Sequence, residues 1–312
     1  MTTKSSSIMV AVLAGAMVWA GGAGGAVRYV ALDGSGTNGL SWETAYRTIQ
    51  AAVDDPGLGN GDEIRVKYGT YVLSVPVKVE KAVNIYGGYS GSGSTRDWQT
   101  YQTVLDCEGE AKRGFDVYAN ARVDGLTITG GYSWGIPPFH GGGIYIQSCA
   151  ATVANCTFYR NHSQNNGGAI AALYAHGTTI SNCTFIENTA AKYGGAIWND
   201  ESNLTITGCA FMGNLAQATA ADVDPDAPIP GGGAIFNKGG QPTISDCMLD
   251  GNSGYYGGGI SNYFSNAIIR NCMLANGGAT SVGGGGMYTY GGSATILSCL
   301  FQGNSTGEMG AG

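Results

Sequence analysis

One feature of this chain constrains its fold more than any other: a cysteine and a glycine pair recur together through its second half. Successive cysteines lie 27, 26, 38, 25 and 27 residues apart, and the Ile or Met after each glycine pair follows nearly the same series. Two landmarks that recur together define a structural repeat. The repeated cysteines are Cys156, Cys183, Cys209, Cys247, Cys272 and Cys299.

Each repeat alternates as short β-strands do, with a bend between one strand and the next. In TISNCTF, Ile180 alternates with polar neighbours, and beyond the bend Cys183 and Phe185 share one face. Most residues before the cysteine tolerate a left-handed backbone. These bend residues include Asn155, Asn182 and Asn271. A second bend is expected at the asparagine that closes each FxxN stretch, and these asparagines include Asn161, Asn188 and Asn214.

Three short strands and three bends per repeat predict an all-β fold, the right-handed parallel β-helix. Its coils stack about 4.8 Å apart, so equivalent residues lie above one another. The cysteines and aromatic residues would then form inward ladders, and the bend asparagines would hydrogen-bond from coil to coil. A leucine-rich or helical solenoid is disfavoured, because neither a leucine consensus nor a long helical period follows residue 60.

The chain divides into three expected segments. Residues 1–26 have the layout of a secretory signal peptide, with Lys4 ahead of an apolar run and then small residues. Residues 27–61 are expected to form a cap, with a short helix from Trp42 to Val53 that covers the first coil. Residues 62–312 are expected to form the β-helix, with no C-terminal cap visible, as in a chain that continues into further coils.

Charge and composition limit the partners that we expect. The formal net charge is -7 and the 15 Lys and Arg residues form no basic run, which argues against nucleic acid and other polyanions. Beyond the leader, no stretch is long and apolar enough to cross a membrane. The expected location is therefore outside the cell or on its surface.

The cysteines raise the question of disulfides, which are common in exported proteins. Stacked coils hold neighbouring Cβ atoms about 4.8 Å apart, whereas a disulfide needs about 3.5–4.5 Å. The six repeated cysteines are therefore expected to be buried thiols, while Cys107 and Cys149 lie outside the ladder and their pairing stays open.

Candidate catalytic residues are sparse. From His140 onward there are thirteen Asp, Glu, Lys and Arg residues, and no two carboxylates fall at equivalent places on adjacent coils. The three histidines also occupy different places in their coils. No cofactor is expected apart from Ca²⁺, for which the acidic residues of one loop are weak candidates. Those residues are Asp222, Asp224 and Asp226, and a solvated loop is the alternative interpretation.

Two features are candidates for binding. Insertions at 132–140 and 215–230 leave the coil at the same point, and the first carries Trp134 and Phe139. The residue after each repeated Ile or Met should point outward, which predicts an interrupted aromatic row on one face. The aromatic members of this row are Tyr145, Trp198, Phe236 and Tyr288. Such a row suits a glycan or a protein, while the alternative is that loops cover it.

The GGAI and FxxN motifs resemble the repeats of chlamydial polymorphic outer-membrane proteins. The opening, from RYVALDGSGTNGLSWETAYRTIQAAV to GDEIRVKYGTY, resembles secreted bacterial proteins with a pectin-lyase-like fold. The resemblance implies an exported surface or passenger protein of the adhesin type, binding a glycan or protein along its side. A polysaccharide lyase or hydrolase and a structural spacer are the alternatives, and the sparse acids favour a role without catalysis.

Overall fold

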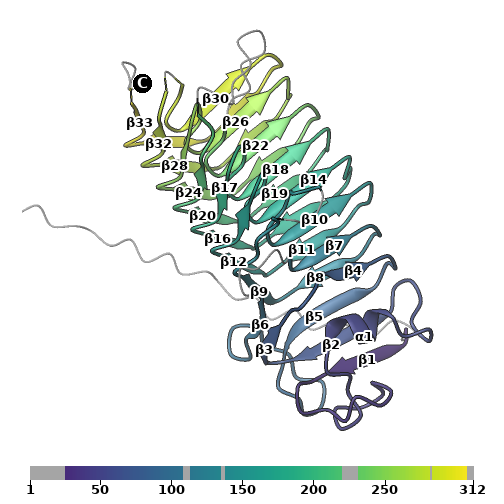
Figure 1. Cartoon of the computed structure of the whole chain (residues 1–312). Coiled ribbons are helices and arrows are strands. Elements are labelled where there is room, and N and C mark those ends of the chain that lie inside the picture. The colour runs from purple at the N-terminus through teal and green to yellow at the C-terminus, as the bar shows by residue number, and fades with distance from the viewer. Residues whose placement is uncertain (1–24, 108–112, 135–137, 220–230, 282, 308–312) are drawn as a thin grey trace, which may run out of the picture.

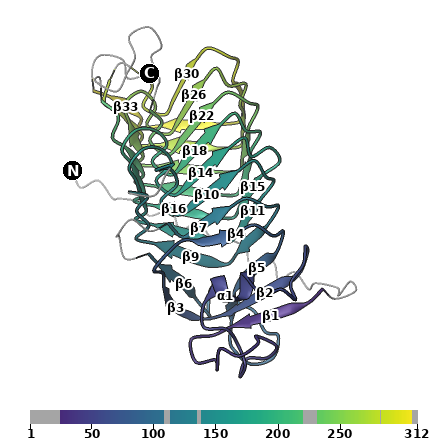
Figure 2. The same cartoon turned by 45° about the vertical axis from the view of Figure 1, so that its right-hand side comes forward.

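The computed structural model describes residues 25–107, 113–134, 138–219, 231–281 and 283–307. They form four parallel sheets that run side by side along a solenoid, together with one short helix (Figures 1 and 2). The right-handed parallel β-helix predicted from the repeat is confirmed. The predicted signal peptide lies almost wholly outside the described residues.

Two sheets begin at the N-terminal end of the solenoid. Sheet A contains, in spatial order, β1 (Val27–Val30), β2 (Glu63–Lys67), β5 (Asn84–Tyr89), β8 (Arg122–Asp124), β11 (Thr152–Ala154), β15 (Thr179–Ser181), β19 (Thr205–Thr207), β23 (Thr243–Ser245), β27 (Ile268–Arg270) and β31 (Thr295–Leu297). Sheet B contains β3 (Gly69–Val72), β6 (Thr103–Asp106), β9 (Leu126–Thr129), β12 (Thr157–Tyr159), β16 (Thr184–Ile186), β20 (Ala210–Met212), β24 (Met248–Asp250), β28 (Met273–Ala275) and β32 (Leu300–Gln302).

The other two sheets complete each coil. Sheet C contains β4 (Val77–Val79), β7 (Phe115–Val117), β10 (Ile144–Gln147), β14 (Ile170–Leu173), β18 (Ile197–Asp200), β22 (Ile235–Lys238), β26 (Ile260–Tyr263) and β30 (Met287–Tyr290). Sheet D contains β13 (His162–Ser163), β17 (Thr189–Ala190), β21 (Leu215–Ala216), β25 (Ser253–Gly254), β29 (Gly278–Ala279) and β33 (Ser305–Thr306).

Sheet D corrects the prediction of three strands per coil, since the regular coils have four. Its strands are only two residues long, as at His162–Ser163 and Thr189–Ala190. Two residues are too few for the alternation that identifies a strand in a sequence. The fourth strand follows the FxxN bend and leads into the glycine pair.

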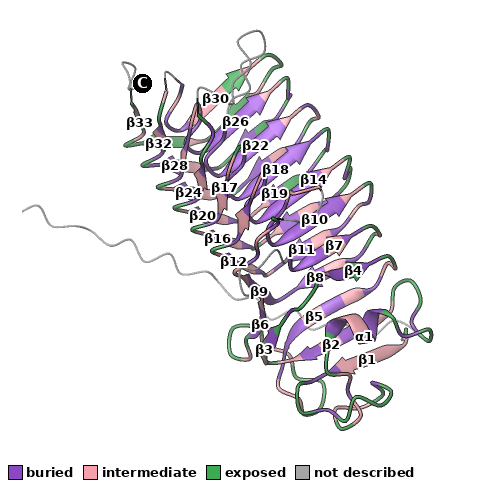
Figure 3. Cartoon of the chain, in the orientation of Figure 1, coloured by how far each residue is buried: buried purple, intermediate pink, exposed green. Residues whose placement is uncertain are grey.

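The core fills the solenoid in register from coil to coil. Ile144, Ile170 and Ile197 pair directly across sheet C, and Figure 3 shows the buried positions continuing along that sheet. The rings of Phe158 and Phe185 stack 4.9 Å apart, and those of Phe185 and Phe211 stack 4.6 Å apart. One inward side chain per coil at each position therefore builds a continuous apolar column.

Asparagines satisfy the polar groups that the inner bend would otherwise leave unpaired. The Nδ2 of Asn161 donates to Oδ1 of Asn188 at 3.0 Å, and Nδ2 of Asn188 donates to Oδ1 of Asn214 at 2.9 Å. Each amide also accepts from the backbone N–H of the asparagine one coil earlier, as Asn188 does from Asn161 at 3.0 Å. All three side chains are buried, so these bonds are sheltered from water.

The asparagines before the cysteines have a different role. Asn155, Asn182 and Asn271 have φ values of 53°, 52° and 53°, in the left-handed region.

A second interior asparagine ladder, in sheet C, was not predicted. Nδ2 of Asn199 donates to Oδ1 of Asn237 at 3.0 Å, and Nδ2 of Asn237 donates to Oδ1 of Asn262 at 2.9 Å. The inward alternation of sheet C predicts apolar residues at these positions, so the pattern alone gave no sign of a polar ladder.

The helix α1 (Ile49–Val53) lies at the N-terminal end of the stack, against β1, β2 and β4 (Figure 1). Thr48 caps it, with its Oγ1 accepting from the N–H of Ala51 at 3.2 Å. The helix is shorter than predicted, because the residues from Ser41 to Thr44 form bends and turns and Tyr46 pairs with Val30 as an isolated bridge. Trp42 therefore lies outside the helix and contributes to another part of the molecule.

A buried ion pair holds this cap and gives it a pH dependence. Nε of Arg28 donates to Oδ2 of Asp55 at 2.5 Å, and the hydroxyl of Tyr46 donates to the same oxygen at 2.8 Å. The hydrogen bonds from Arg28 lower the pKa of Asp55 from 3.8 to about 2. Because the folded pKa is depressed, this stabilisation is present above pH 3.8 and disappears as the pH falls toward 2.

We expect the wild-type protein to lose about 2 kcal/mol of unfolding free energy through this pair over that interval. Urea unfolding at pH 5 and pH 2.5 should therefore show a larger loss in wild type than in Asp55→Asn, which has no carboxyl to titrate. Equal losses in the two proteins would contradict the assignment.

Within its described residues, the structure has no helix with the length and hydropathy that crossing a bilayer requires.

Candidate binding face

The aromatic row predicted after the repeated Ile or Met points away from the coil interior but is mostly covered. Tyr145, Trp198 and Phe236 are buried, in a second apolar cluster that also includes Tyr193 and Ala218. This favours the alternative stated above, that loops cover the row, over an exposed row. Alternation along a strand sets the direction of a side chain, whereas the covering residues come from the loops that follow sheet D.

His140, at the end of the first insertion, is part of this cover. Its ring lies 4.4 Å from that of Trp198, centroid to centroid. Burial lowers the pKa of His140 to about 4, with a further contribution from the nearby charge of Arg113. His140 is therefore neutral at pH 7. His140 thus covers part of the Trp198 ring.

Other predicted binding residues are more accessible. Trp134 is 53% exposed, Phe139 is half-buried with a φ of 60°, and Tyr288 is half-buried with its ring 5.0 Å from that of Tyr256. The structure does not join them to Tyr145, Trp198 and Phe236 as one exposed surface. The candidate calcium ligands Asp222, Asp224 and Asp226 lie outside the described residues.

The repeated cysteines line the core as thiols. Sγ of Cys156 donates to the carbonyl of Ala154 at 3.1 Å, and Sγ of Cys183 donates to that of Ser181 at 3.2 Å. Burial raises the pKa of Cys183, and it raises that of Cys149 to about 11. Cys183 and Cys149 therefore stay protonated and are poor nucleophiles. Cys107 is also buried in the core.

The described part of the chain contains no group of three or more His, Cys, Asp or Glu side chains arranged to hold a metal ion.

A cluster that the sequence did not reveal covers the outer face of sheet A near its N-terminal end. We call it the arginine–aromatic face. It is built on β1, β2, β5 and β8 and on two loops that fold against them. Its members are Tyr29, Trp42, Glu63, Arg65, Tyr86, Tyr89, Arg96, Trp98, Arg122 and Asp124.

Arg65 occupies the first half of this face, between two tyrosine rings. Its Cζ lies 6.0 Å from the ring centroid of Tyr29 and 5.6 Å from that of Tyr89. Trp42, from the loop that was expected to be helical, packs against both rings at 4.6 and 5.8 Å. Glu63 accepts from Nε and Nη2 of Arg65 at 3.0 and 2.8 Å. The guanidinium plane is therefore held in a fixed orientation.

The second half is centred on Tyr86, which lies between two arginines. The Cζ atoms of Arg96 and Arg122 lie 5.0 and 5.9 Å from its ring centroid. Trp98 also contacts Arg96, with Cζ 4.9 Å from its ring centroid. Nε of Arg96 donates to the carbonyl of Gly87 at 2.8 Å, which fixes the loop against β5. Two cations and two rings are thus interleaved.

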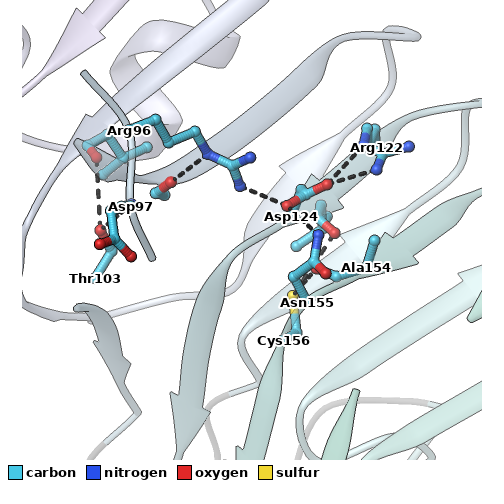
Figure 4. A network of polar contacts seen from close by, with 12 residues as sticks. Arg96, Asp97, Thr103, Arg122, Asp124, Ala154, Asn155 and Cys156 are labelled. Carbon is cyan, nitrogen blue, oxygen red and sulfur yellow. Dashed lines mark hydrogen bonds and ion pairs between the residues drawn. The ribbon is translucent and has the colours of Figure 1, made fainter. Parts of the chain in front are cut away.

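Asp124 joins the two arginines (Figure 4). Its Oδ2 accepts from Nε and Nη2 of Arg122 at 2.8 and 2.6 Å, and its Oδ1 accepts from Arg96 and from Nδ2 of Asn155, the latter at 3.0 Å. The Asp124 side chain is only 2% exposed, whereas that of Arg122 is 35% exposed. The carboxylate therefore serves as a buried anchor, and the guanidinium groups reach the surface.

This arrangement leaves binding groups at the surface. Within the described part of the chain, the hydrogen bonds of Arg65, Arg96 and Arg122 use Nε and Nη2 and none uses Nη1, so two N–H donors on each guanidinium have no partner. Tyr86 is half-buried, and Trp98 is 36% exposed. Three arginines and two carboxylates carry a net positive charge, on a chain whose formal net charge is -7. The face can therefore offer ring surfaces and donors to an acceptor-rich ligand.

The sequence matches the family described as the right-handed beta helix region over residues 114–225 and again over 142–311. The chain belongs to this family. The second match alone spans more than half of the chain. The arginine–aromatic face lies mostly before the matched residues, on the early coils of this β-helix protein.

Solved structures with similar folds include one titled "Rhamnogalacturonan lyase", with a TM-score of 0.37 and 11% identity over 92% of this chain and 89% of that chain. Another is titled "Structure of the Streptococcus pneumoniae surface protein and adhesin PfbA", with a TM-score of 0.26 and 10% identity over 83% of this chain and 93% of that chain. No curated protein matches the sequence. The site residues of this β-helix protein are therefore assigned from its own geometry.

The sequence did not predict this face, because the early coils lack the Asn-Cys and GGAI motifs that mark the later coils. Arg65, Arg96 and Arg122 are far apart in the chain, so no basic run marks them. One signal was available, since the alternation of EIRVK and RVD places charged residues on the outward side. The register between those strands was needed to bring the charges together.

Proposed function

We propose that this β-helix protein is exported and binds a glycan along its side without cleaving it. The observation that supports the proposal is the arginine–aromatic face, where Tyr86 and Trp98 supply rings and Arg96 and Arg122 supply donors. Flat sugar faces pack on such rings, and guanidinium groups bind carboxylates through paired N–H bonds. A carboxylate-bearing glycan fits both features.

Electrostatics favour a local contact over general attraction to polyanions. The whole chain is acidic, so a long polyanion such as nucleic acid meets unfavourable long-range repulsion. A short uronate segment docked on the face instead meets three guanidinium groups within the range of direct hydrogen bonds. The net charge therefore disfavours a long polyanion, while the arginine–aromatic face suits a short one.

The expected leader and the resemblance to polymorphic outer-membrane repeats support an extracellular or surface location. A role as an adhesin or passenger protein follows from that location together with a binding face on a rigid scaffold. N-terminal sequencing of the secreted protein tests the location, and a chain that is retained uncleaved inside the cell would contradict it.

A lyase or hydrolase is the alternative, and the geometry of the face disfavours it. Asp124 accepts four hydrogen bonds, and Glu63 accepts two from Arg65. Carboxylates engaged in this way are poorly placed to take or give a proton during bond cleavage. Release of unsaturated or reducing ends from polygalacturonate or alginate would favour the enzyme instead.

We expect the double variant Arg122→Gln with Trp98→Ala to bind a galacturonate oligomer at least 10-fold more weakly than wild type. The loss of one charged hydrogen-bonding group and one ring accounts for that factor. Isothermal titration calorimetry measures it. Arg270→Gln is the matched control, because Arg270 is an exposed outward residue on the same sheet several coils away. Equal affinities for all three proteins would refute the proposed face.

A further inference from the structure

A separate hollow lies at the junction of sheets B and D, away from the arginine–aromatic face. Its volume is about 390 Å³, and its lining is Gly130, Gly131, Tyr132, Arg160 and His162. Tyr132 and His162 occupy the same place on adjacent coils, and their ring centroids are 4.8 Å apart with the planes at 57°. Neither residue belongs to the repeat ladders or to the binding face described above.

Two of the lining residues are glycines, and the coil register fixes the backbone around the hollow. Gly130 precedes Arg160 by one coil, and its φ of 66° matches the 52° of Arg160. At this bend position the next coils carry Glu187 and Gly213. Gly130 therefore has no side chain at the bend position where Arg160 carries its own. Gly131 cannot carry a side chain, because a Cβ there would lie 2.0 Å from the carbonyl oxygen of Gly142.

The polar groups around the hollow balance in charge. Nε of Arg160 donates to Oε2 of Glu187 at 2.7 Å, so this cation already has a counter-ion. Burial lowers the pKa of His162, which keeps its imidazole neutral at pH 7. The imidazole then has one donor and one acceptor, and the Tyr132 hydroxyl has both. No side-chain hydrogen bond occupies either group within the described residues.

We propose that this hollow is a subsite for one neutral pyranose unit. An uncharged ligand suits the balanced charge, and its hydroxyl groups can both donate and accept, as the imidazole, the phenol and the Arg160–Glu187 pair require. The Tyr132 ring supplies an apolar surface for the C–H face of the sugar. The subsite goes beyond the proposed binding of a carboxylated glycan, and it stands or fails independently of the arginine–aromatic face.

The three histidines provide the test, because each imidazole gives its own NMR signals. Methyl glycosides of glucose, galactose and mannose are titrated into the full chain. A single sugar of this size should bind with a dissociation constant of about 1 mM. We expect the His162 signals to move with at least one of these glycosides while those of His140 and His176 stay in place. If the His162 signals stayed in place with every glycoside at about 50 mM, some fifty times that constant, the proposal would be overturned.

Gly130→Asn is the decisive variant, since Gly130 lines the hollow, asparagine tolerates the left-handed backbone, and its side chain would extend from that lining. It should remove the His162 response. Gly213→Asn is the matched control at the equivalent bend, with a φ of 61°, and should retain the response. A response that survives Gly130→Asn would place the sugar elsewhere and overturn the assignment, as would a response to galacturonate alone. The double variant of the arginine–aromatic face should respond as wild type does.

Discussion

Replacing Phe185 with alanine is expected to destabilise the protein by about 3–5 kcal/mol. Its ring is fully buried and stacks between Phe158 and Phe211 with planes only 4° and 3° from parallel. Removing the ring leaves a cavity inside a solenoid whose backbone is fixed by parallel pairing on both sides. The neighbouring coils cannot collapse into the gap without breaking that pairing, which places the expected loss toward the upper end of the range.

Urea unfolding followed by circular dichroism measures the loss. Tyr174→Ala is the control, because Tyr174 is 54% exposed, and it should change the unfolding free energy by less than about 1 kcal/mol. A Phe185→Ala protein no less stable than Tyr174→Ala would show that the aromatic column does not hold the coils together.

The substitution Asn188→Ala should cost about 3–5 kcal/mol, although it removes no apolar surface. Asn188 accepts from the N–H and Nδ2 of Asn161 and donates to Asn214 and to the carbonyl of Phe158. All of these groups are buried in the bend, where water cannot replace the lost partner. Each buried group left unpaired costs about 1–3 kcal/mol. The substitution therefore leaves unpaired polar groups on both adjacent coils.

Asn203→Ala is the matched control. Oδ1 of Asn203 accepts from the N–H of Gln241 at 2.7 Å, but at an exposed position where water can take over. Its effect should stay below about 1 kcal/mol. If thermal or urea unfolding gave the two asparagine variants the same stability, the interior ladder would have no energetic role.

The sequence predicted the stacking register well because every coil repeats the same physical problem. An inward aromatic such as Phe158 needs an aromatic or aliphatic partner one coil away, and the spacing of Phe185 provides it. The same logic identified the bends at Asn155 and Asn182, since a left-handed residue is needed wherever the coil turns sharply.

The prediction was weaker where one coil differs from the next. Alternation showed that Trp198 points outward, but it did not show that His140 would cover its ring. The arginine–aromatic face depends on the pairing of β2 with β5, which has a register shift between Arg65 and Lys67. It also depends on a loop that carries Arg96 back over the sheet. Neither feature has a periodic signal, because each occurs once.

Chemical labelling of arginine locates the bound glycan most directly. Phenylglyoxal modifies accessible guanidinium groups, and mass spectrometry reports the extent at each arginine with and without a galacturonate oligomer. The proposed function predicts that the oligomer protects Arg96 and Arg122, while Arg47 and Arg270, both exposed and outside the face, react equally in the two samples. Protection at Arg270 with continued reaction at Arg96 and Arg122 would contradict the proposed function.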